Sequence, residues 1–207
     1  FDGLEKSSYA NQYVIGQPLF IEKRYQWLGV DLNSGNHRFF DYDGDGRITA
    51  PNDQQVIVNT SQTLFGGWEN RLEFGDISLS FLMQFTKQPY VQNYLSRFSR
   101  PGLLMNQPRL VLNRWRVPGD LTDVQKFANS NTASNNAFTA FRQSNAAFTD
   151  GSFIRLRNIN LEYTILSKAD KRKYISNLGV YFQIQNLLTI SKYEGLDPET
   201  RSFLPPI

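Results

Sequence analysis

The sequence predicts an all-β fold of antiparallel strands. Alternation of apolar and polar residues recurs along the chain, whereas helical periodicity is scarce. Aromatic residues make up 14% of the composition, which suits either a soluble all-β domain or a barrel with aromatic girdles. The connections range from a tight turn at Gly75-Asp76 to the long segments 31–66, 87–150 and 191–207. Short connections on one side of a sheet and long ones on the other are typical of outer-membrane barrels.

The first predicted strand lies within Val14–Val30. Four apolar or aromatic residues share one parity there, and Lys23 interrupts the face that they form. These four residues are Leu19, Ile21, Tyr25 and Trp27.

Two alternating runs around Gly75-Asp76 predict a β-hairpin. The run Asp76–Phe85 has the length and pattern of a tilted membrane strand, with Leu82 interrupting its small polar face. The preceding run Gly67–Phe74 also alternates, and Gly75-Asp76 supplies the tight turn between the two. One face of the second strand should carry Ile77, Leu79, Phe81, Met83 and Phe85, and the other face Ser78, Ser80 and Gln84.

Two further strands are predicted near 158–165 and 180–185. Arg155 and Arg157 fall on the apolar parity of the first, so either a β-bulge shifts the register or this end lies above the hydrocarbon. A connection of moderate length, Leu166–Asn177, joins the two strands. The expected apolar faces contain Ile159, Leu161, Tyr163, Ile165, Val180, Phe182 and Ile184, opposite Asn158, Asn160, Glu162, Thr164, Tyr181, Gln183 and Gln185.

Periodicity alone does not separate a membrane barrel from a soluble β-sandwich. An antiparallel sheet with one wet face has the same pattern, and the pattern by itself favours the soluble alternative. The apolar runs are far shorter than the roughly 18 residues that a membrane helix needs. Barrel strands, however, carry only an alternating signal.

Composition argues against several function classes. The chain of 207 residues has a net charge of +3, and its basic residues are spread out, which argues against a nucleic-acid partner. The absence of cysteine excludes disulfide bonds and thiol chemistry. His37 is the only histidine, lies in a Gly/Asn-rich turn without a nucleophile motif nearby, and is expected to be a surface loop residue. The sequence therefore predicts no catalytic residues and no enzyme.

The sharpest chemical signal is the acidic run from Asp41 to Asp53, which matches the start of a calcium loop of EF-hand or dockerin type. Three closely spaced carboxylates repel one another unless a cation lies among them, and Gly46 stands where such loops turn sharply. Asn52 replaces the bidentate glutamate, and Asp53 could substitute for it. The predicted calcium or magnesium ligands are Asp41, Asp43, Asp45, the Arg47 carbonyl, Thr49 and Asp53.

Five motifs in this order make the chain resemble the C-terminal part of SusC/RagA-type TonB-dependent outer-membrane transporters. The two most specific are Asp150-Gly-Ser-Phe-Ile-Arg-Leu-Arg-Asn158 and Asn186-Leu-Leu-Thr-Ile-Ser-Lys-Tyr-Glu-Gly-Leu-Asp-Pro-Glu199. The others are Tyr13-Val-Ile-Gly-Gln-Pro-Leu19, then Tyr25-Gln-Trp-Leu-Gly-Val30 with Asp41–Thr49, and Phe65-Gly-Gly-Trp68 through Phe85.

The resemblance implies a Gram-negative outer-membrane location and about five strands of a 22-stranded barrel whose plug domain is not in this chain. It implies TonB-driven import of an oligosaccharide or peptide together with a SusD-like surface lipoprotein, with TonB acting through an N-terminal part not present here. We expect residues 1–207 to be a fragment, because Phe1 and Leu204-Pro-Pro-Ile207 both look cut, and the terminal strand to follow Ile207.

The resemblance also makes the sidedness and topology of the strands predictable. The apolar faces would meet outer-membrane lipid and the polar faces the lumen. With Gly75-Asp76 as a periplasmic turn, segments 31–66, 87–150 and 191–207 would lie outside the cell, and 87–150 would be the best candidate for contact with substrate or the lipoprotein. The alternative is a secreted all-β carbohydrate-binding module with a calcium-stabilised loop, which would stay in water without detergent.

Overall fold

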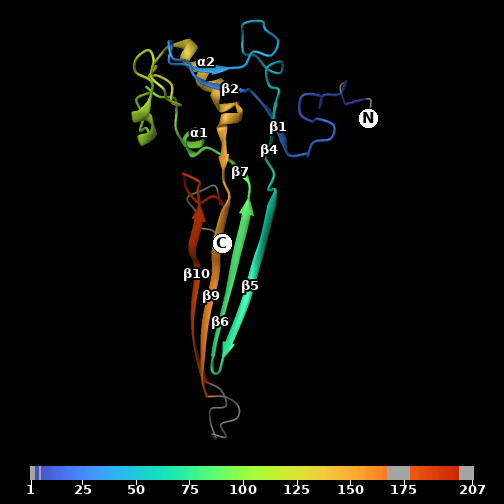
Figure 1. Cartoon of the computed structure of the whole chain (residues 1–207), viewed down its shortest axis with the longest axis vertical. Coiled ribbons are helices and arrows are strands. Elements are labelled where there is room, and N and C mark those ends of the chain that lie inside the picture. Colours follow the sequence, from blue (N-terminus) through green and yellow to red (C-terminus); the bar gives the residue numbers. More distant parts are fainter. Residues whose placement is uncertain (1–2, 5, 167–177, 201–207) are drawn as a thin grey trace. The chain divides into compact units, whose positions relative to one another are not determined.

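The computed structural model describes residues 3–4, 6–166 and 178–200 (Figure 1). The chain forms two compact units, one from residues 1–61 and 89–149 and the other from residues 62–88 and 150–207. Strands dominate, and the four-stranded sheet and the pairs β1-β4 and β2-β3 are antiparallel, which confirms the predicted all-β fold. The predicted connection Leu166–Asn177 and the end Leu204–Ile207 lie almost wholly outside the described residues.

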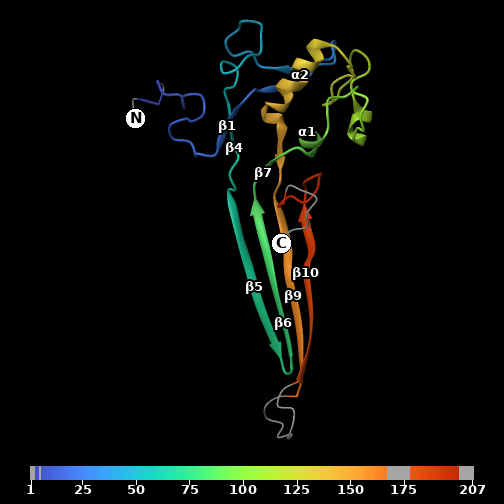
Figure 2. The same ribbon diagram turned by 180° about the vertical axis from the view of Figure 1, so that it is seen from behind.

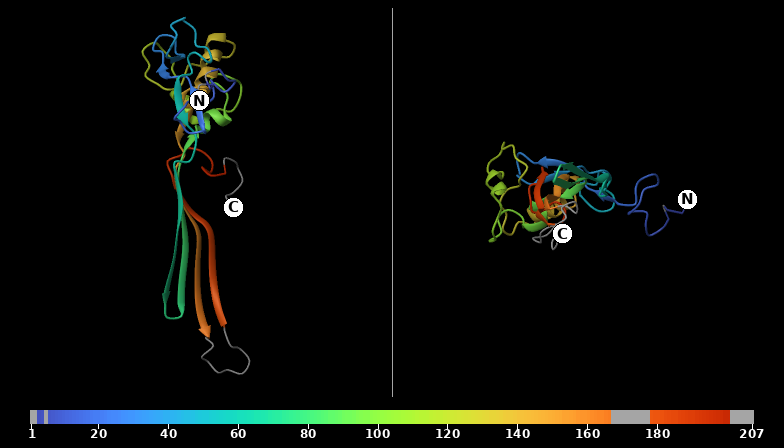
Figure 3. Two further views of the ribbon diagram at one scale, coloured as in Figure 1. Left: turned by 90° about the vertical axis from the view of Figure 1, so that its right-hand side faces the viewer. Right: turned by 90° about the horizontal axis from the view of Figure 1, so that it is seen from below.

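The second unit is built on one sheet of four long strands in the order β10-β9-β6-β5. These strands run side by side along their length (Figures 2 and 3). β5 and β6 are 11 residues long and β9 and β10 are 14 residues long, so each exceeds or matches the roughly 9–11 residues that cross a bilayer as a tilted strand. Their bounds are Leu64–Phe74 for β5, Ile77–Lys87 for β6, Phe153–Leu166 for β9 and Leu178–Ser191 for β10.

The predicted hairpin is present. β5 and β6 pair without a register shift from Leu64↔Lys87 to Phe74↔Ile77. The turn lies at Gly75, whose φ of 58° is in the left-handed region that glycine adopts at little cost.

A β-bulge explains the two arginines that fall on the wrong parity of β9. Leu82 of β6 faces Asn158, whereas the next residue, Met83, faces Leu156, so Arg157 is the extra residue. The bulge returns Arg155 to the polar face, because it now lies opposite Gln84. Of the two explanations that the sequence leaves open, the register shift is therefore the one that the fold adopts. A matching irregularity lies in β10 between Gln185 and Leu188, where Asn186 has a φ of 51°.

The register sorts the sheet into two chemically different faces, because residues directly opposite each other on neighbouring strands point to the same side. The odd-numbered residues of β6 from Ile77 to Phe85 lie opposite apolar residues of β9, which lie in turn opposite apolar residues of β10. The even-numbered residues of β6 from Ser78 to Gln84 lie opposite polar residues of β9. The apolar face is defined by Trp68, Leu72, Phe74, Ile77, Leu79, Phe81, Met83, Phe85, Ile154, Leu156, Ile159, Leu161, Tyr163, Val180, Phe182, Ile184, Leu188 and Ile190. The polar face is defined by Glu69, Arg71, Glu73, Ser78, Ser80, Gln84, Arg155, Asn158, Asn160, Glu162, Tyr181, Gln183, Gln185 and Thr189.

The first unit contains short strands and two α-helices. The strands form three two-stranded sheets, β1-β4, β2-β3 and β7-β8. The strand bounds are Ile21–Arg24 (β1), Trp27–Val30 (β2), His37–Phe39 (β3), Val56–Asn59 (β4), Pro89–Val91 (β7) and Phe148–Asp150 (β8). The helices are Asn93–Arg97 (α1) and Thr132–Arg142 (α2), with 3-10 turns at Arg109–Asn113 (η1) and Asn145–Ala147 (η2).

The predicted strand across Val14–Val30 is wrong as a fifth member of the long sheet. This segment is divided into β1 and β2, which pair with β4 and β3. An isolated bridge from Tyr25 to Ser144 separates the two strands. Ile21, Tyr25 and Trp27 share one parity because they pack into the first unit, where Ile21 and Tyr25 are buried.

Helix α2 replaces part of a predicted exposed loop. The Asn131 side chain accepts a hydrogen bond from the Ser134 backbone N–H at 3.1 Å and so caps the helix. Phe138 and Phe141, three residues apart on one face, are buried in the core of the first unit. The polar residues that precede Phe138 and Phe141 are typical of a loop. Burial of these two aromatic side chains stabilises the helix instead. Among the residues that the structure describes, no helix is long and apolar enough to cross a membrane.

His37 is a core residue, so the expectation of a surface position is wrong. It is 5% exposed and stacks on the Phe141 ring at a centroid distance of 3.9 Å. Trp27 Nε1 donates a hydrogen bond to His37 Nδ1 at 3.1 Å, which requires that nitrogen to be unprotonated. Burial lowers the pKa of His37 to about 3. The imidazole therefore serves as a neutral aromatic core side chain rather than as a general base.

Candidate functional site

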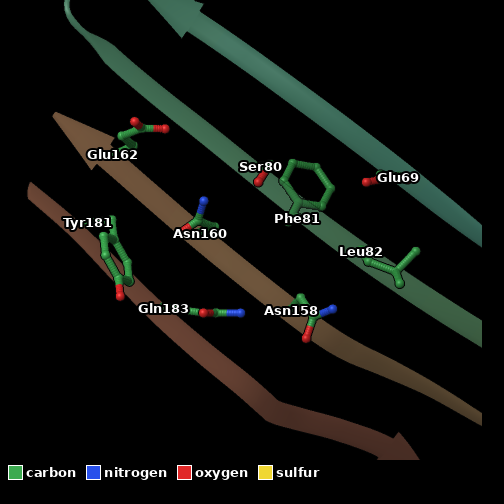
Figure 4. A pocket seen from close by; sticks show the side chains of 9 residues that line it. All are labelled: Glu69, Ser80, Phe81, Leu82, Asn158, Asn160, Glu162, Tyr181 and Gln183. Atoms are coloured by element: carbon green, nitrogen blue, oxygen red, sulfur yellow. The ribbon is translucent and has the colours of Figure 1, made fainter. Parts of the chain in front are cut away.

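The polar face of the long sheet is hollowed along its middle (Figure 4). A hollow of about 540 Å³ is bordered by side chains from all four long strands. Carboxylate, amide and hydroxyl groups dominate its border, so it offers donors and acceptors suited to hydroxyl-rich or amide-rich ligands. The bordering residues are Glu69 from β5, Ser80, Phe81 and Leu82 from β6, Asn158, Asn160 and Glu162 from β9, and Tyr181 and Gln183 from β10.

A second hollow of about 700 Å³ lies further along the same sheet and shares Leu82 and Asn158 with the first. Its border includes Gly66 and Gly67 of β5 and Arg157 of β9. Glycine is required at position 66 for a steric reason, because a Cβ there would come within 2.6 Å of the Phe85 ring. The two hollows adjoin at Leu82 and Asn158, so together they extend along the polar face.

A buried arginine lies at the end of this face. Arg155 is 0% exposed, and its guanidinium donates to Thr189 at 2.9 Å, to Glu199 at 2.6 Å and to Asp197. The Phe153 ring packs beside it, with 5.2 Å from the ring centroid to Cζ. Each of the three guanidinium nitrogens therefore has an acceptor, and an aromatic ring lies beside the group, which reduces the penalty of burying an arginine.

The bulged residue Arg157 extends the same network. Its guanidinium donates to Gln84 at 2.6 Å and pairs with the second carboxylate oxygen of Glu199. Glu199 thus bridges Arg155 and Arg157, with one oxygen on each. The extra residue in β9 is what brings both arginines to the polar face.

The partner carboxylates come from the segment that follows β10. Asp197 uses its other oxygen to accept from the backbone N–H groups of Glu199 and Thr200, at 2.8 and 3.2 Å. The buried Gln88 side chain donates to the carbonyls of Pro198 and Gly151, at 3.0 and 3.3 Å. Residues 192–200, called here the return segment, are in this way fixed to the polar face.

The two most specific sequence motifs are thus one structural unit. The first motif supplies Arg155 and Arg157, and the second supplies Asp197 and Glu199. Both motifs are visible in the sequence, but their contact is not. The ion pairs between them span more than forty positions, and no local pattern encodes them.

The acidic loop folds as a tight, internally hydrogen-bonded turn. Asp41, Asp43 and Asp45 each offer a carboxylate oxygen, and these oxygens lie within 4.8 Å of one another. Asp41 accepts from the backbone N–H groups of Gly44 and Gly46, at 2.7 and 2.8 Å. These two donors, Gly46 first, hold the pKa of Asp41 below its usual value, so this carboxylate is ionised at neutral pH. The convergence of three oxygens fits a hard divalent cation.

The remaining predicted ligands have other positions. Asp53 is 0% exposed and accepts from the backbone N–H groups of Tyr42 and Thr49, at 2.7 and 2.8 Å, so it closes the base of the loop. It is not part of the group formed by Asp41, Asp43 and Asp45. Asn52 donates to Asp43 at 2.7 Å. The structure brings together Asp41, Asp43 and Asp45, and leaves Asp53 as the structural anchor of the turn.

Curated relatives of this chain are TonB-dependent receptors. The chain is 26% identical over 181 residues to TonB-dependent receptor P39 of Formosa agariphila, covering 86% of this chain and 17% of the relative. It is 26% identical over 174 residues to TonB-dependent receptor SusC of Bacteroides thetaiotaomicron, covering 79% of this chain and 15% of the relative. The chain therefore spans about a sixth of the length of these relatives. No protein-family model matches it.

The fold also has solved counterparts. The structure of the RagAB peptide importer in the open-open state matches 84% of this chain and 19% of the solved chain, with a TM-score of 0.65 and 22% identity. The structure of the RagAB peptide transporter matches 84% of this chain and 20% of its own, with a TM-score of 0.63 and 24% identity. Sequence and fold together confirm that this chain is SusC/RagA-like and resembles a segment of the TonB-dependent transporters.

Proposed function

We propose that the long sheet is part of the wall of an outer-membrane β-barrel and that the whole protein imports an oligomeric nutrient. The observation that carries the proposal is the division of the sheet into an apolar and a polar face. Residues of the apolar face such as Phe74, Val180 and Phe182 are 88%, 58% and 59% exposed. An exposed apolar surface of this extent is rare on soluble monomers and fits contact with lipid.

The polar face would then line the lumen of the barrel. Its amides, hydroxyls and carboxylates would contact the nutrient on its way through, and the substrate would be an oligosaccharide or a peptide. The return segment, fixed by Arg155 and Arg157, would narrow the extracellular side of the lumen. Transport of this kind needs binding and regulated passage rather than covalent chemistry, which agrees with relatives that are receptors.

The partners in this proposal are TonB, a SusD-like surface lipoprotein and membrane lipid. TonB would act through a part of the protein outside this chain. Segments 31–66 and 87–150 would be extracellular, and the apolar side chains of 87–150 would be available for the lipoprotein or the nutrient. Leu104, Met105 and Leu121 of this segment are 99%, 62% and 88% exposed. These features favour an interaction surface over a simple connection between strands.

Fractionation and uptake assays on the whole protein test the proposal. The protein should sediment with outer membranes and need detergent for extraction, and cells that lack it should lose uptake of a labelled oligosaccharide or peptide mixture. Collapse of the proton gradient should abolish uptake in cells that have it. A protein that stays in water after cell breakage would instead support the secreted carbohydrate-binding module.

We also propose that the acidic loop binds calcium, or magnesium, as a local clip. Asp41, Asp43 and Asp45 would be the carboxylate ligands, and the Arg47 carbonyl, Thr49 or water would complete the shell. Asp53 would contribute indirectly, by holding the turn that presents the other groups. The proximity of the three carboxylates supports the proposal, because an ion among them converts repulsion into attraction.

A further inference from the structure

A third hollow, of about 330 Å³, lies at the end of the long sheet opposite the Gly75 turn. It is formed entirely within the second unit, where β6 and β10 end and β9 begins. Its volume is at the lower end of the roughly 300–1,000 Å³ that is typical of ligand sites. We call it the lysine hollow, lined by Leu64, Phe85, Thr86, Lys87, Asp150, Ser152, Phe153, Ile154, Ile190, Ser191 and Lys192.

Two ammonium groups border the hollow from different strands. Lys87 ends β6 and Lys192 follows β10, and both are exposed. Within residues 3–4, 6–166 and 178–200, no salt bridge includes either of them. Asp150 is the one acidic side chain on the border, so the hollow keeps one positive charge in excess.

Asp150 is already engaged locally. Its carboxylate accepts from the Ser152 backbone N–H at 2.9 Å, and the Ser152 side chain and backbone donors together lower its pKa. Lys192 and Lys87 add smaller electrostatic contributions in the same direction, and all three side chains border the same hollow. Two cations and a single carboxylate on one border leave one positive charge that a further anion can balance.

The wall of the hollow is continuous with the apolar face. Phe85, Ile154 and Ile190 belong to that face and are 36%, 43% and 60% exposed. A ligand that fills the hollow would therefore meet positive charge at the end of the strands and an apolar surface along them. This combination matches an amphiphile with an anionic head and hydrocarbon chains, and matches neither a free anion nor a polar nutrient.

We propose that the lysine hollow binds the phosphate-bearing head group of a membrane lipid, with Lys87 and Lys192 as its cationic ligands and Phe85, Ile154 and Ile190 beneath its acyl chains. The inference rests on the proposed barrel wall, because only then does the apolar face meet lipid. The lipid would mark the depth at which the sheet leaves the hydrocarbon. The excess positive charge at the strand ends is what selects an anionic lipid over a zwitterionic one.

Lipid binding to the whole transporter, purified in detergent, tests the site by native mass spectrometry. The probes are phosphatidylglycerol, phosphatidylcholine with identical acyl chains, and inorganic phosphate. The double variant Lys87→Gln with Lys192→Gln should lose phosphatidylglycerol affinity by roughly five-fold for each lysine, while phosphatidylcholine binding stays unchanged. Lys87→Arg with Lys192→Arg should keep the preference, because the charge is retained.

Arg71→Gln is the control for each single lysine-to-glutamine variant, since each removes one positive charge and Arg71 lies on the polar face of the same sheet. Equal phosphatidylglycerol binding by the wild type and the double glutamine variant would overturn the inference. Competition by millimolar inorganic phosphate, without any preference between the lipids, would overturn it in favour of a free-anion site. Failure of the proposed barrel wall has a different signature, because the protein would then bind neither lipid and would not need detergent.

Discussion

Arg155 is a fully buried cation whose three guanidinium nitrogens each donate a hydrogen bond. Its guanidinium contacts a hydroxyl, two carboxylates and an aromatic ring. Arginine suits this position because its planar fork can hold two carboxylates at once, whereas a lysine offers a single ammonium group. The same network fixes the return segment, so stability and the shape of the polar face depend on one side chain.

Replacement of Arg155 by alanine should therefore be costly. Asp197 would lose its arginine partner and Glu199 one of its two, and loss of one partner from a buried ion pair costs up to about 3–5 kcal/mol. Limited proteolysis of the whole protein should detect new cleavage within residues 192–200. Arg71→Ala is the control, because Arg71 pairs with Glu73 in an exposed position and should cost no more than about 1 kcal/mol. Equal protease resistance in both variants would contradict the role of the network.

His37 predicts a pH dependence of the first unit. Its folded-state pKa of about 3 lies below the ordinary value of 6.5, so protonation favours the unfolded state. The contribution of His37 to the free energy of unfolding is fully present above pH 6.5 and falls as the pH decreases from 6.5 toward 3. Between pH 6.5 and 5 the loss should be about 2 kcal/mol.

Chemical unfolding of the wild type and His37→Gln at pH 7.5 and 5 isolates this effect. Glutamine keeps an acceptor for Trp27 but does not titrate in this range. The wild type should lose more stability than the variant over the same interval. Parallel pH profiles for the two proteins would contradict a neutral, buried imidazole.

The acidic loop predicts weak calcium binding. Without a bidentate glutamate the dissociation constant should fall at about 10⁻⁴–10⁻³ M, as in extracellular modules. Calorimetric titration of the metal-stripped protein should show calcium heat that Asp43→Ala removes. Asn33→Ala, outside the loop, should leave the heat unchanged. An absence of heat at millimolar calcium would leave an acidic turn without an ion.

At the scale of elements, the cap of α2 decides whether a polar segment becomes a helix. Asn131→Ala removes the acceptor for the Ser134 N–H and should cost about 1 kcal/mol, whereas Asn131→Asp should retain the cap. Hydrogen exchange across residues 132–142 should speed up in the alanine variant alone. Unchanged exchange in both would show that packing of Phe138 and Phe141 suffices without the cap.

Local alternation predicts some elements well and others poorly. Strands β5, β6, β9 and β10 follow from period-two patterns because each has one apolar and one polar face. The bulge at Arg157 was one of two explanations of a broken pattern. Helix α2 and the burial of His37 were not predicted, because both depend on aromatic partners that lie far away in the sequence.

At the scale of the whole molecule, the candidate sites were predicted only in part. The acidic loop is local, so the convergence of three of its predicted ligands, Asp41, Asp43 and Asp45, follows from their spacing. The network of Arg155 and Arg157 with the return segment joins distant motifs and needed the fold. The chain spans about a sixth of the length of its relatives, so the proposed import activity has to be tested on the whole protein.

The central claim is that the long sheet separates lipid from water, and site-directed labelling tests it most directly. Single cysteines would each carry a fluorophore in membranes and would replace Leu79, Phe182, Ser80 or Gln183 in the whole protein. The 207 residues of this chain contain no cysteine of their own. Positions 79 and 182 should be quenched by lipid-soluble quenchers, and positions 80 and 183 by water-soluble ones. Water-soluble quenching at 79 and 182, with lipid quenching at 80 and 183, would contradict the account.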